Sequence, residues 1–117
     1  MYQSLYSEMA AETTESIRQN ERAAFERSIG LLELARTKGR GSRESVEALL
    51  FVSRLWSVLL EDLATEGNDL PDALKASLIS IGIWILRRTE DIRQGRVEDF
   101  SSLIDVSRTI KSGLERR

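Results

Sequence analysis

The segment from Leu78 to Leu86 is apolar at almost every position and is interrupted only by Ser80 and Gly82. Its isoleucines also alternate as they would in a β-strand, but no second strand-like segment exists to pair with it, and the residues before it favour a helix. A helix that is apolar on all sides has to be covered on all sides, which places it in the middle of a bundle. The sequence therefore predicts an all-α fold, a compact bundle of four to five helices, with the helix from about Asp69 to Gln94 at its centre.

Glycines mark where the predicted helices end. Gly39 and Gly41, then Gly67, then Gly95 each follow a stretch with helical apolar periodicity. Helices commonly end at a residue in a left-handed conformation, which glycine adopts without steric cost. These breaks divide the chain from Arg22 onwards into successive helices.

Polar residues mark where the next helices begin. Ser42 is predicted to cap the second helix and Asp99 the fourth, because a short side chain with an oxygen can accept hydrogen bonds from the free N–H groups of the first turn. Asp69 is predicted to cap the third helix. Pro71 then falls in the first turn, and Asp72 is positioned as the partner in a capping box.

The N-terminal third allows two arrangements. The stretch from Arg22 to Lys38 has one apolar helical face, whereas Thr13 and Thr14 are a weak pair for a helix. Either one long helix begins near Ser4, or a short N-terminal helix breaks near Thr13. We favour the break.

The later helices differ in how apolar residues are distributed around them. The last helix has one apolar face, made of Phe100, Leu103, Ile104, Ile110 and Leu114 with Ser107 among them. The helix after Ser42 has two stripes, one containing Trp56 and the other made of Phe51, Leu55 and Val58. We expect Trp56 and Trp84 to lie in the core, since aromatic residues at helical spacing usually do. The second stripe is expected to be exposed.

The composition excludes most catalytic chemistry. The chain of 117 residues, interpreted as a single helical domain over residues 1–117, contains no cysteine and no histidine. It therefore lacks thiolate and imidazole ligands and the most common general base. Its 19 acidic residues are spread without the spacing of a calcium loop. We expect no catalytic residues, no metal, no cofactor and no enzymatic activity.

Charge and hydropathy restrict the location and the partners. The net charge of −2 provides no broad basic field, so direct nucleic-acid binding is not expected. The first residues lack the charged-then-apolar pattern of a secretory signal. The longest apolar run, from Ile81 to Leu86, is far too short to cross a membrane. We expect a cytoplasmic protein that does not insert into membranes.

Two apolar surfaces are candidates for binding a partner helix in a groove. The first is the amphipathic N-terminal segment, which carries two tyrosines and is marginal as an isolated helix. The second is the stripe on the second helix. The candidate partner-binding residues are Tyr2, Leu5, Tyr6, Met9, Phe51, Leu55 and Val58.

Three segments resemble the FlaF family, the flagellar biosynthesis regulators of flagellated alphaproteobacteria. They are Leu55-Trp56 followed by Leu59, Leu60 and Leu63, then the segment from Asn68 to Leu78, then the segment from Leu103 to Leu114. Their order and spacing carry the resemblance, which covers most of the chain. Ser53 and Ser107 depart from it, because asparagine is common at these positions in such proteins.

The resemblance implies a non-enzymatic role in making the flagellar filament. It implies that flagellin is the partner, and that the protein is a secretion chaperone for flagellin or a positive factor for its production. An alternative is that the protein docks on FlbT, which restrains translation of the flagellin messenger RNA, and does not touch flagellin. Both alternatives are open at the level of the sequence.

Overall fold

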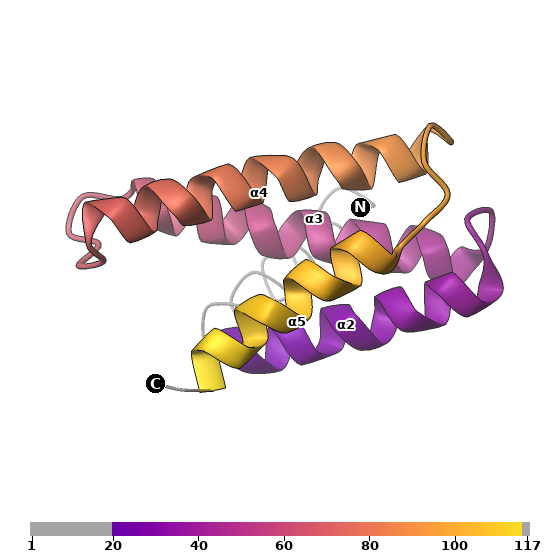
Figure 1. Ribbon diagram of the computed structural model, residues 1–117, viewed down its shortest axis with the longest axis horizontal. Coiled ribbons are helices and arrows are strands. Elements are labelled where there is room, and N and C mark those ends of the chain that lie inside the picture. The colour runs from indigo at the N-terminus through magenta and orange to yellow at the C-terminus, as the bar shows by residue number, and fades with distance from the viewer. Residues whose placement is uncertain (1–19, 116–117) are drawn as a thin grey trace, which may run out of the picture.

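A computed structural model describes residues 20–115 as a bundle of helices (Figure 1). The helices are α2 (Glu21–Lys38), α3 (Arg43–Ala64), α4 (Asp72–Arg93) and α5 (Ser101–Glu115). No strand occurs within this range, and the predicted all-α fold is confirmed. The two arrangements considered near Ser4 and Thr13 lie outside the described residues.

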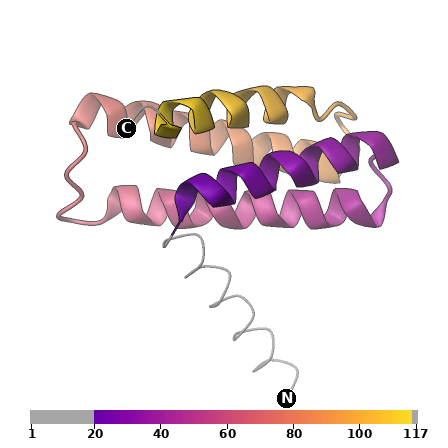
Figure 2. The ribbon, with the colours of Figure 1, turned by 90° about the horizontal axis from the view of Figure 1, so that it is seen from below.

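The bundle has four sides, each lying between two neighbouring helices. Helix packing closes three of these sides and leaves one open. α3 packs against both α2 and α4, and α5 packs along α2, whereas α4 and α5 touch only sparingly. In Figure 2, α2 and α3 form one layer, and α4 and α5 form the other. Figure 1 shows that α4 and α5 lie close together near the turn that joins them and diverge away from it. The open side is therefore the one between α4 and α5.

The inner helix is α3, so the prediction that the helix from about Asp69 to Gln94 lies at the centre is wrong. α4 buries only Gly82, Ile85, Thr89 and Ile92, whereas α3 buries eight residues. Ile83 of α4 is 43 % exposed. α4 has a single extensive neighbour among the described helices, so α3 covers one of its sides and leaves other apolar side chains in solvent.

Trp56 lies in the core, as predicted, and is only 1 % exposed. Its ring meets Phe25 of α2 edge to face, with the ring centroids 5.9 Å apart. Pairs of this kind contribute about 0.5–1.5 kcal/mol beyond the area they bury. Trp84 differs from the prediction, because it is half-buried and the Arg88 guanidinium lies over its ring at 5.2 Å from the centroid.

The last helix buries the face that its sequence predicts. Phe100, Leu103, Ile104 and Ser107 are all buried, and Ile110 is half-buried. Two ion pairs also join α5 to α2: Arg108 with Glu33, and Lys111 with Glu26 at 3.5 Å. Exposed pairs of this kind each contribute about 0–1 kcal/mol, so the apolar face holds α5 in place.

Glycines stand in the turns that follow α2, α3 and α4, as predicted. Gly39, Gly67 and Gly95 have φ values of 96°, 92° and 80°. After α4, the Arg96 N–H donates to the Asp91 carbonyl at 2.9 Å, and the Gly95 N–H donates to the Ile92 carbonyl at 3.1 Å. These two bonds form a Schellman motif, in which the left-handed residue is Gly95.

Two of the three predicted helix starts are confirmed. The Ser42 hydroxyl accepts a hydrogen bond from the Ser45 N–H at 3.1 Å. The Asp99 carboxylate accepts from the Ser101 hydroxyl at 2.6 Å and from the Ser101 N–H at 2.9 Å. These bonds lower the pKa of Asp99, the hydroxyl contributing most, because they favour the charged carboxylate.

The predicted cap at Asp69 is wrong. α4 begins at Asp72, and Pro71 precedes it without any side-chain cap. Asn68 instead organises the turn, since its side chain accepts from the Leu70 N–H at 3.1 Å and donates to the Asp62 carbonyl at 3.1 Å. An amide can accept and donate at once, whereas a carboxylate only accepts, so Asn68 ties the turn back to the end of α3.

Gly82 is a point of close approach between α3 and α4. A Cβ atom at this position would lie 2.8 Å from Leu60 Cδ2 and 2.9 Å from Trp56 Cε3. These distances are well below the optimal separation of about 3.5–4.0 Å between carbon atoms. The absence of a side chain at Gly82 therefore allows α4 to seat on the indole.

We expect Gly82→Ala to lower the free energy of unfolding by about 1–3 kcal/mol, the usual effect of overpacking a core. Gly30, which is exposed in α2 and where a Cβ atom would meet no other atom within 4 Å, is the matched control. Gly30→Ala should raise the free energy of unfolding by about 0.5–1 kcal/mol, because alanine favours the helix. Urea unfolding measures both variants. Equal stabilisation by the two substitutions would contradict the close approach at Gly82.

Candidate partner-binding site

An apolar cleft of about 240 Å³ lies between α4 and α5, at the end of the bundle where α4 begins and α5 ends. All four described helices and the α3–α4 turn contribute to its lining. Trp56 lies in its wall. The other apolar lining residues are Phe25, Leu59, Leu63, Leu70, Leu78 and Ile110. A concave, mostly apolar site with a few polar groups is the usual form of a binding site.

The divergence of α4 from α5 creates this cleft. Leu78 lines it from α4 and Ile110 lines it from α5, and both side chains are half-buried. Leu74 precedes Leu78 by one helical turn, so it lies on the same face of α4, where it is 40 % exposed. The turn organised by Asn68 places Leu70 in the wall at this end. The apolar wall therefore continues from the core to the surface along α4.

The Trp56 indole is incompletely satisfied. Among the described residues, its Nε1 atom is buried and has no hydrogen-bond partner. Leaving a buried donor unpaired costs about 1–3 kcal/mol. The Cε3 edge of the ring faces Gly82, and Nε1 lies diagonally across the ring, so the N–H is turned away from the α3–α4 contact. Trp56, one of the residues that line the cleft, therefore carries a hydrogen-bond donor that no described residue satisfies.

The end of the bundle that holds the cleft is acidic. Glu21 and Asp62 are among its lining residues, and no lysine or arginine within 20–115 is. The stretch 61–72, which ends α3 and forms the next turn, contains five acidic residues and no basic one. The stretch 36–43, at the opposite end of α3, contains four basic residues and no acidic one. Acidic residues therefore outnumber basic ones in the segment that ends α3 and forms the next turn, although the net charge of the chain is only −2.

Two kinds of feature are absent from the part of the chain that the structure describes. No group of three or more His, Cys, Asp or Glu residues within 20–115 could hold a metal ion. None of the described helices is long and apolar enough to cross a membrane.

Comparison with known proteins identifies the family. The sequence model of the family described as flagellar protein FlaF matches residues 2–114. The chain belongs to the FlaF family. It is therefore a flagellar protein. Comparison with curated proteins and with solved structures gives no match.

The structure contradicts part of the partner-binding prediction for this FlaF protein. Leu55 and Val58 are buried in the core, so the prediction that they lie on an exposed stripe is wrong. Phe51 is half-buried, and the Arg27 guanidinium lies 5.3 Å from its ring centroid. The cause is the position of α3 between α2 and α4, which buries both sides of the helix.

The other predicted residues, Tyr2, Leu5, Tyr6 and Met9, lie outside the described residues, so the prediction made for them stays a prediction. Of the three candidates that the structure describes, Phe51, Leu55 and Val58, none lines the cleft. The sequence indicates Leu78 and Ile110 only as parts of apolar helices, and Leu70 only as a residue of the segment from Asn68 to Leu78. No periodicity indicates that residues so far apart in the sequence meet in one wall.

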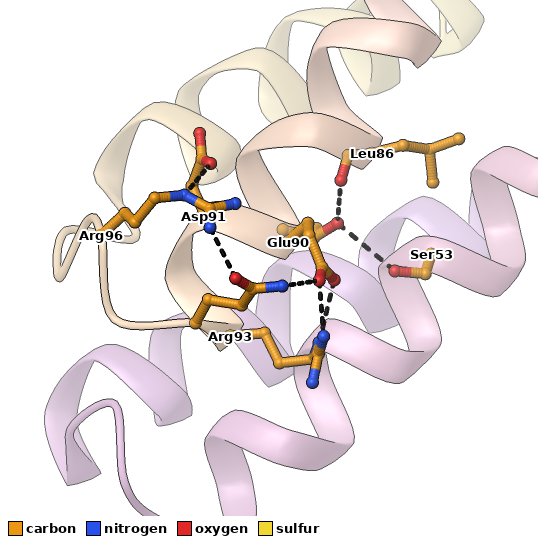
Figure 3. A network of polar contacts seen from close by, with 8 residues as sticks. Ser53, Leu86, Glu90, Asp91, Arg93 and Arg96 are labelled. Atoms are coloured by element: carbon orange, nitrogen blue, oxygen red, sulfur yellow. Dashed lines mark hydrogen bonds and ion pairs between the residues drawn. The ribbon is translucent and has the colours of Figure 1, made fainter.

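A second apolar surface of this FlaF protein lies on the outer side of α3. Val46 and Leu50 are exposed there, Leu50 by 66 %. They line a smaller cavity of about 140 Å³ between α3 and α4, together with Ser53 and Thr89. The Ser53 hydroxyl donates to the Thr89 hydroxyl at 3.4 Å, so it bonds across to α4 and not back to its own helix (Figure 3).

The arginines near the end of α4 are largely engaged within the chain. Arg93 bonds to Glu90 and Arg96 bonds to Asp91, as Figure 3 shows. The hydrogen bonds from Arg93, and next those from Gln94, lower the pKa of Glu90 from 4.5 to about 2. This network lies at the turn between α4 and α5 and joins the end of α4 to the residues that follow it.

We expect the Glu90 carboxyl group to titrate at a pKa of about 2 in the folded protein, against 4.5 for the ordinary group. Because the folded pKa is the lower one, the contribution to stability is present above pH 4.5 and is lost as the pH falls towards 2. Arg93→Gln should return the pKa towards the ordinary value, and Arg87→Gln, which removes an exposed neighbouring charge, should leave it low. Carbon-detected NMR titration measures this; an unchanged pKa in Arg93→Gln would contradict the assigned cause.

Proposed function

We propose that this FlaF protein binds flagellin without catalysis and serves as a secretion chaperone for flagellin or a positive factor for its production. The membership of the family supports the flagellar role. The observation that carries the binding role is the apolar cleft between α4 and α5. A cytoplasmic location, before export of the filament subunit, accompanies this proposal.

The cleft suits a helix better than a small molecule. Its lining includes one residue from each of α4 and α5, two helices that touch only sparingly, and its apolar wall continues to the exposed Leu74. Helix-in-groove recognition needs an apolar groove of this kind, into which side chains spaced by three or four residues insert. A partner helix laid between α4 and α5 would close the one side of the bundle that the described helices leave open.

The chemistry of the cleft favours holding over reacting. Among the described residues that line it, the titratable ones are the carboxylates Glu21 and Asp62, and the others are apolar except for Asn68. Non-covalent holding would be useful for a subunit that polymerises. An apolar stripe left exposed on such a subunit promotes early association, and covering it delays that association until the chaperone is released.

Docking on FlbT is the second candidate function, and one observation favours it. The outer surface around Val46 and Leu50 is apolar, exposed and separate from the cleft. A partner seated there would not compete directly with one seated between α4 and α5. Both roles could then belong to a single chain.

We expect the purified protein to co-elute with flagellin, and Leu78→Gln to raise the dissociation constant at least about tenfold, since a polar group in the apolar wall is desolvated without a partner. Leu50→Gln is the matched control on the outer surface and should change the flagellin affinity by less than about twofold. Calorimetric titration measures the affinities, with the melting temperature of each variant checking the fold.

The opposite pattern would place flagellin on the outer surface: Leu50→Gln would weaken binding and Leu78→Gln would not. Tight co-elution with FlbT and none with flagellin would contradict the chaperone role and support the second candidate.

A further inference from the structure

We propose that the segment held between α4 and α5 is an amphipathic helix whose apolar stripe is bordered by lysine or arginine, and that it supplies an oxygen acceptor near Trp56. This proposal relies on the proposed function only for the identity of the protein that carries this helix. The inference itself rests on the shape, the charge and the unsatisfied donor of the cleft.

The apolar side chains in the wall of the cleft are the reason to expect an apolar stripe on the occupant. Leu78, Leu70 and Ile110 line the cleft and are half-buried, so each keeps apolar surface in water. Leu74 extends the same wall outward. Removing such surface from water is favourable by about 25 cal/mol per Å². An occupant with apolar side chains at positions i, i+3, i+4 and i+7 presents a continuous stripe to this wall.

The charges around the cleft are the reason to expect lysine or arginine beside the apolar stripe of the occupant. Glu66 and Asp69 are exposed on the turn that also contributes Asn68 and Leu70 to the lining. The described basic residues closest in sequence to the lining of the cleft are Lys75 on α4, Lys111 on α5 and Arg22, which follows Glu21 on α2. Lys75 is half-buried and lies on the face of α4 with Ile79 and Leu86, while Lys111 pairs with Glu26. A helix bordered by positive charge is attracted to this end, and one bordered by negative charge is repelled.

The unpaired N–H group of the Trp56 indole is the reason to expect an oxygen acceptor on the occupant. The Trp56 N–H is buried in the wall without a partner among the described residues. A small movement of the wall on binding would bring a hydroxyl, amide or terminal carbonyl oxygen of the occupant within reach of this donor. Satisfying it removes a penalty that the unbound protein carries. The occupant is therefore expected to change the surroundings of this one indole.

The test uses two synthetic helices of about 18 residues, about 27 Å long. They share one leucine stripe containing a single serine, lack tryptophan, and are bordered either by lysine or by glutamate. The full chain carries Trp84→Phe, which leaves Trp56 as its single tryptophan because the sequence has two. We expect the lysine-bordered helix to shift the Trp56 fluorescence and to bind at least about tenfold more tightly than the glutamate-bordered one at about 0.05 M salt.

Matched variants separate specific docking from general attraction. Glu66→Gln with Asp69→Asn should raise the dissociation constant of the lysine-bordered helix about three- to tenfold. Glu47→Gln with Glu98→Gln removes the same charge elsewhere and should change it less than about twofold. Leu78→Gln should weaken binding at least about tenfold. Equal effects of the two charge pairs, equal binding of the two helices, or an unaltered affinity in Leu78→Gln would overturn the proposal.

The same preparation distinguishes this proposal from the proposed function. If flagellin fails to bind while the lysine-bordered helix binds and obeys the variants, the assigned chemistry of the cleft stands and the identity of the partner is wrong. If flagellin binds with the same affinity to the wild type and to Leu78→Gln, the proposed function stands and the cleft is not its site.

Discussion

The contact of the Trp56 indole with two other helices determines the rest of the architecture. One edge of the ring meets Gly82 of α4, and Phe25 of α2 packs on it edge to face. α3 is thereby the helix against which both α2 and α4 are positioned. α5 is then held by α2, through Phe100, Leu103 and Ile104 and their neighbours. Because α4 and α5 are fixed to different helices, nothing in this arrangement requires them to pack on one another, and they separate beyond their common turn.

Much of the local structure could be predicted from the sequence because local steric and hydrogen-bonding rules determine it. Glycines with positive φ follow three helices, and Ser42 and Asp99 accept the hydrogen bonds expected of them. The failure at Asp69 is also local in origin. Asn68 competes for the same turn, and its amide can both accept and donate, which a carboxylate cannot.

The predictions about burial were wrong where burial depends on how many other helices pack against a given helix. Periodicity reports which sides of a helix are apolar, but not whether another helix is present to cover each side. The stripe containing Leu55 and Val58 was predicted to be exposed, and it is covered because α3 is the inner helix. The apolar surround of α4 was predicted to be covered, and Ile83 is exposed because α4 has one extensive neighbour. The cleft could not be predicted either, since Phe25, Trp56, Leu78 and Ile110 come from four different helices.

The wrong burial predictions for α3 and α4 have one physical cause, the number of helices that pack on each of them, and this cause bears on function. A helix that is apolar nearly all round carries a solubility cost when only one side is covered, and such surface on a small soluble protein usually marks an interaction site. In this FlaF protein the uncovered side of α4 adjoins a cleft with an acidic surround and an unpaired indole N–H. The exposed apolar side chains and the unpaired donor are each unfavourable among the described helices, and an occupant of the kind proposed above would cover the first and satisfy the second. In such a complex α3 would cover one side of α4, and the partner would cover a side that the described helices leave in solvent.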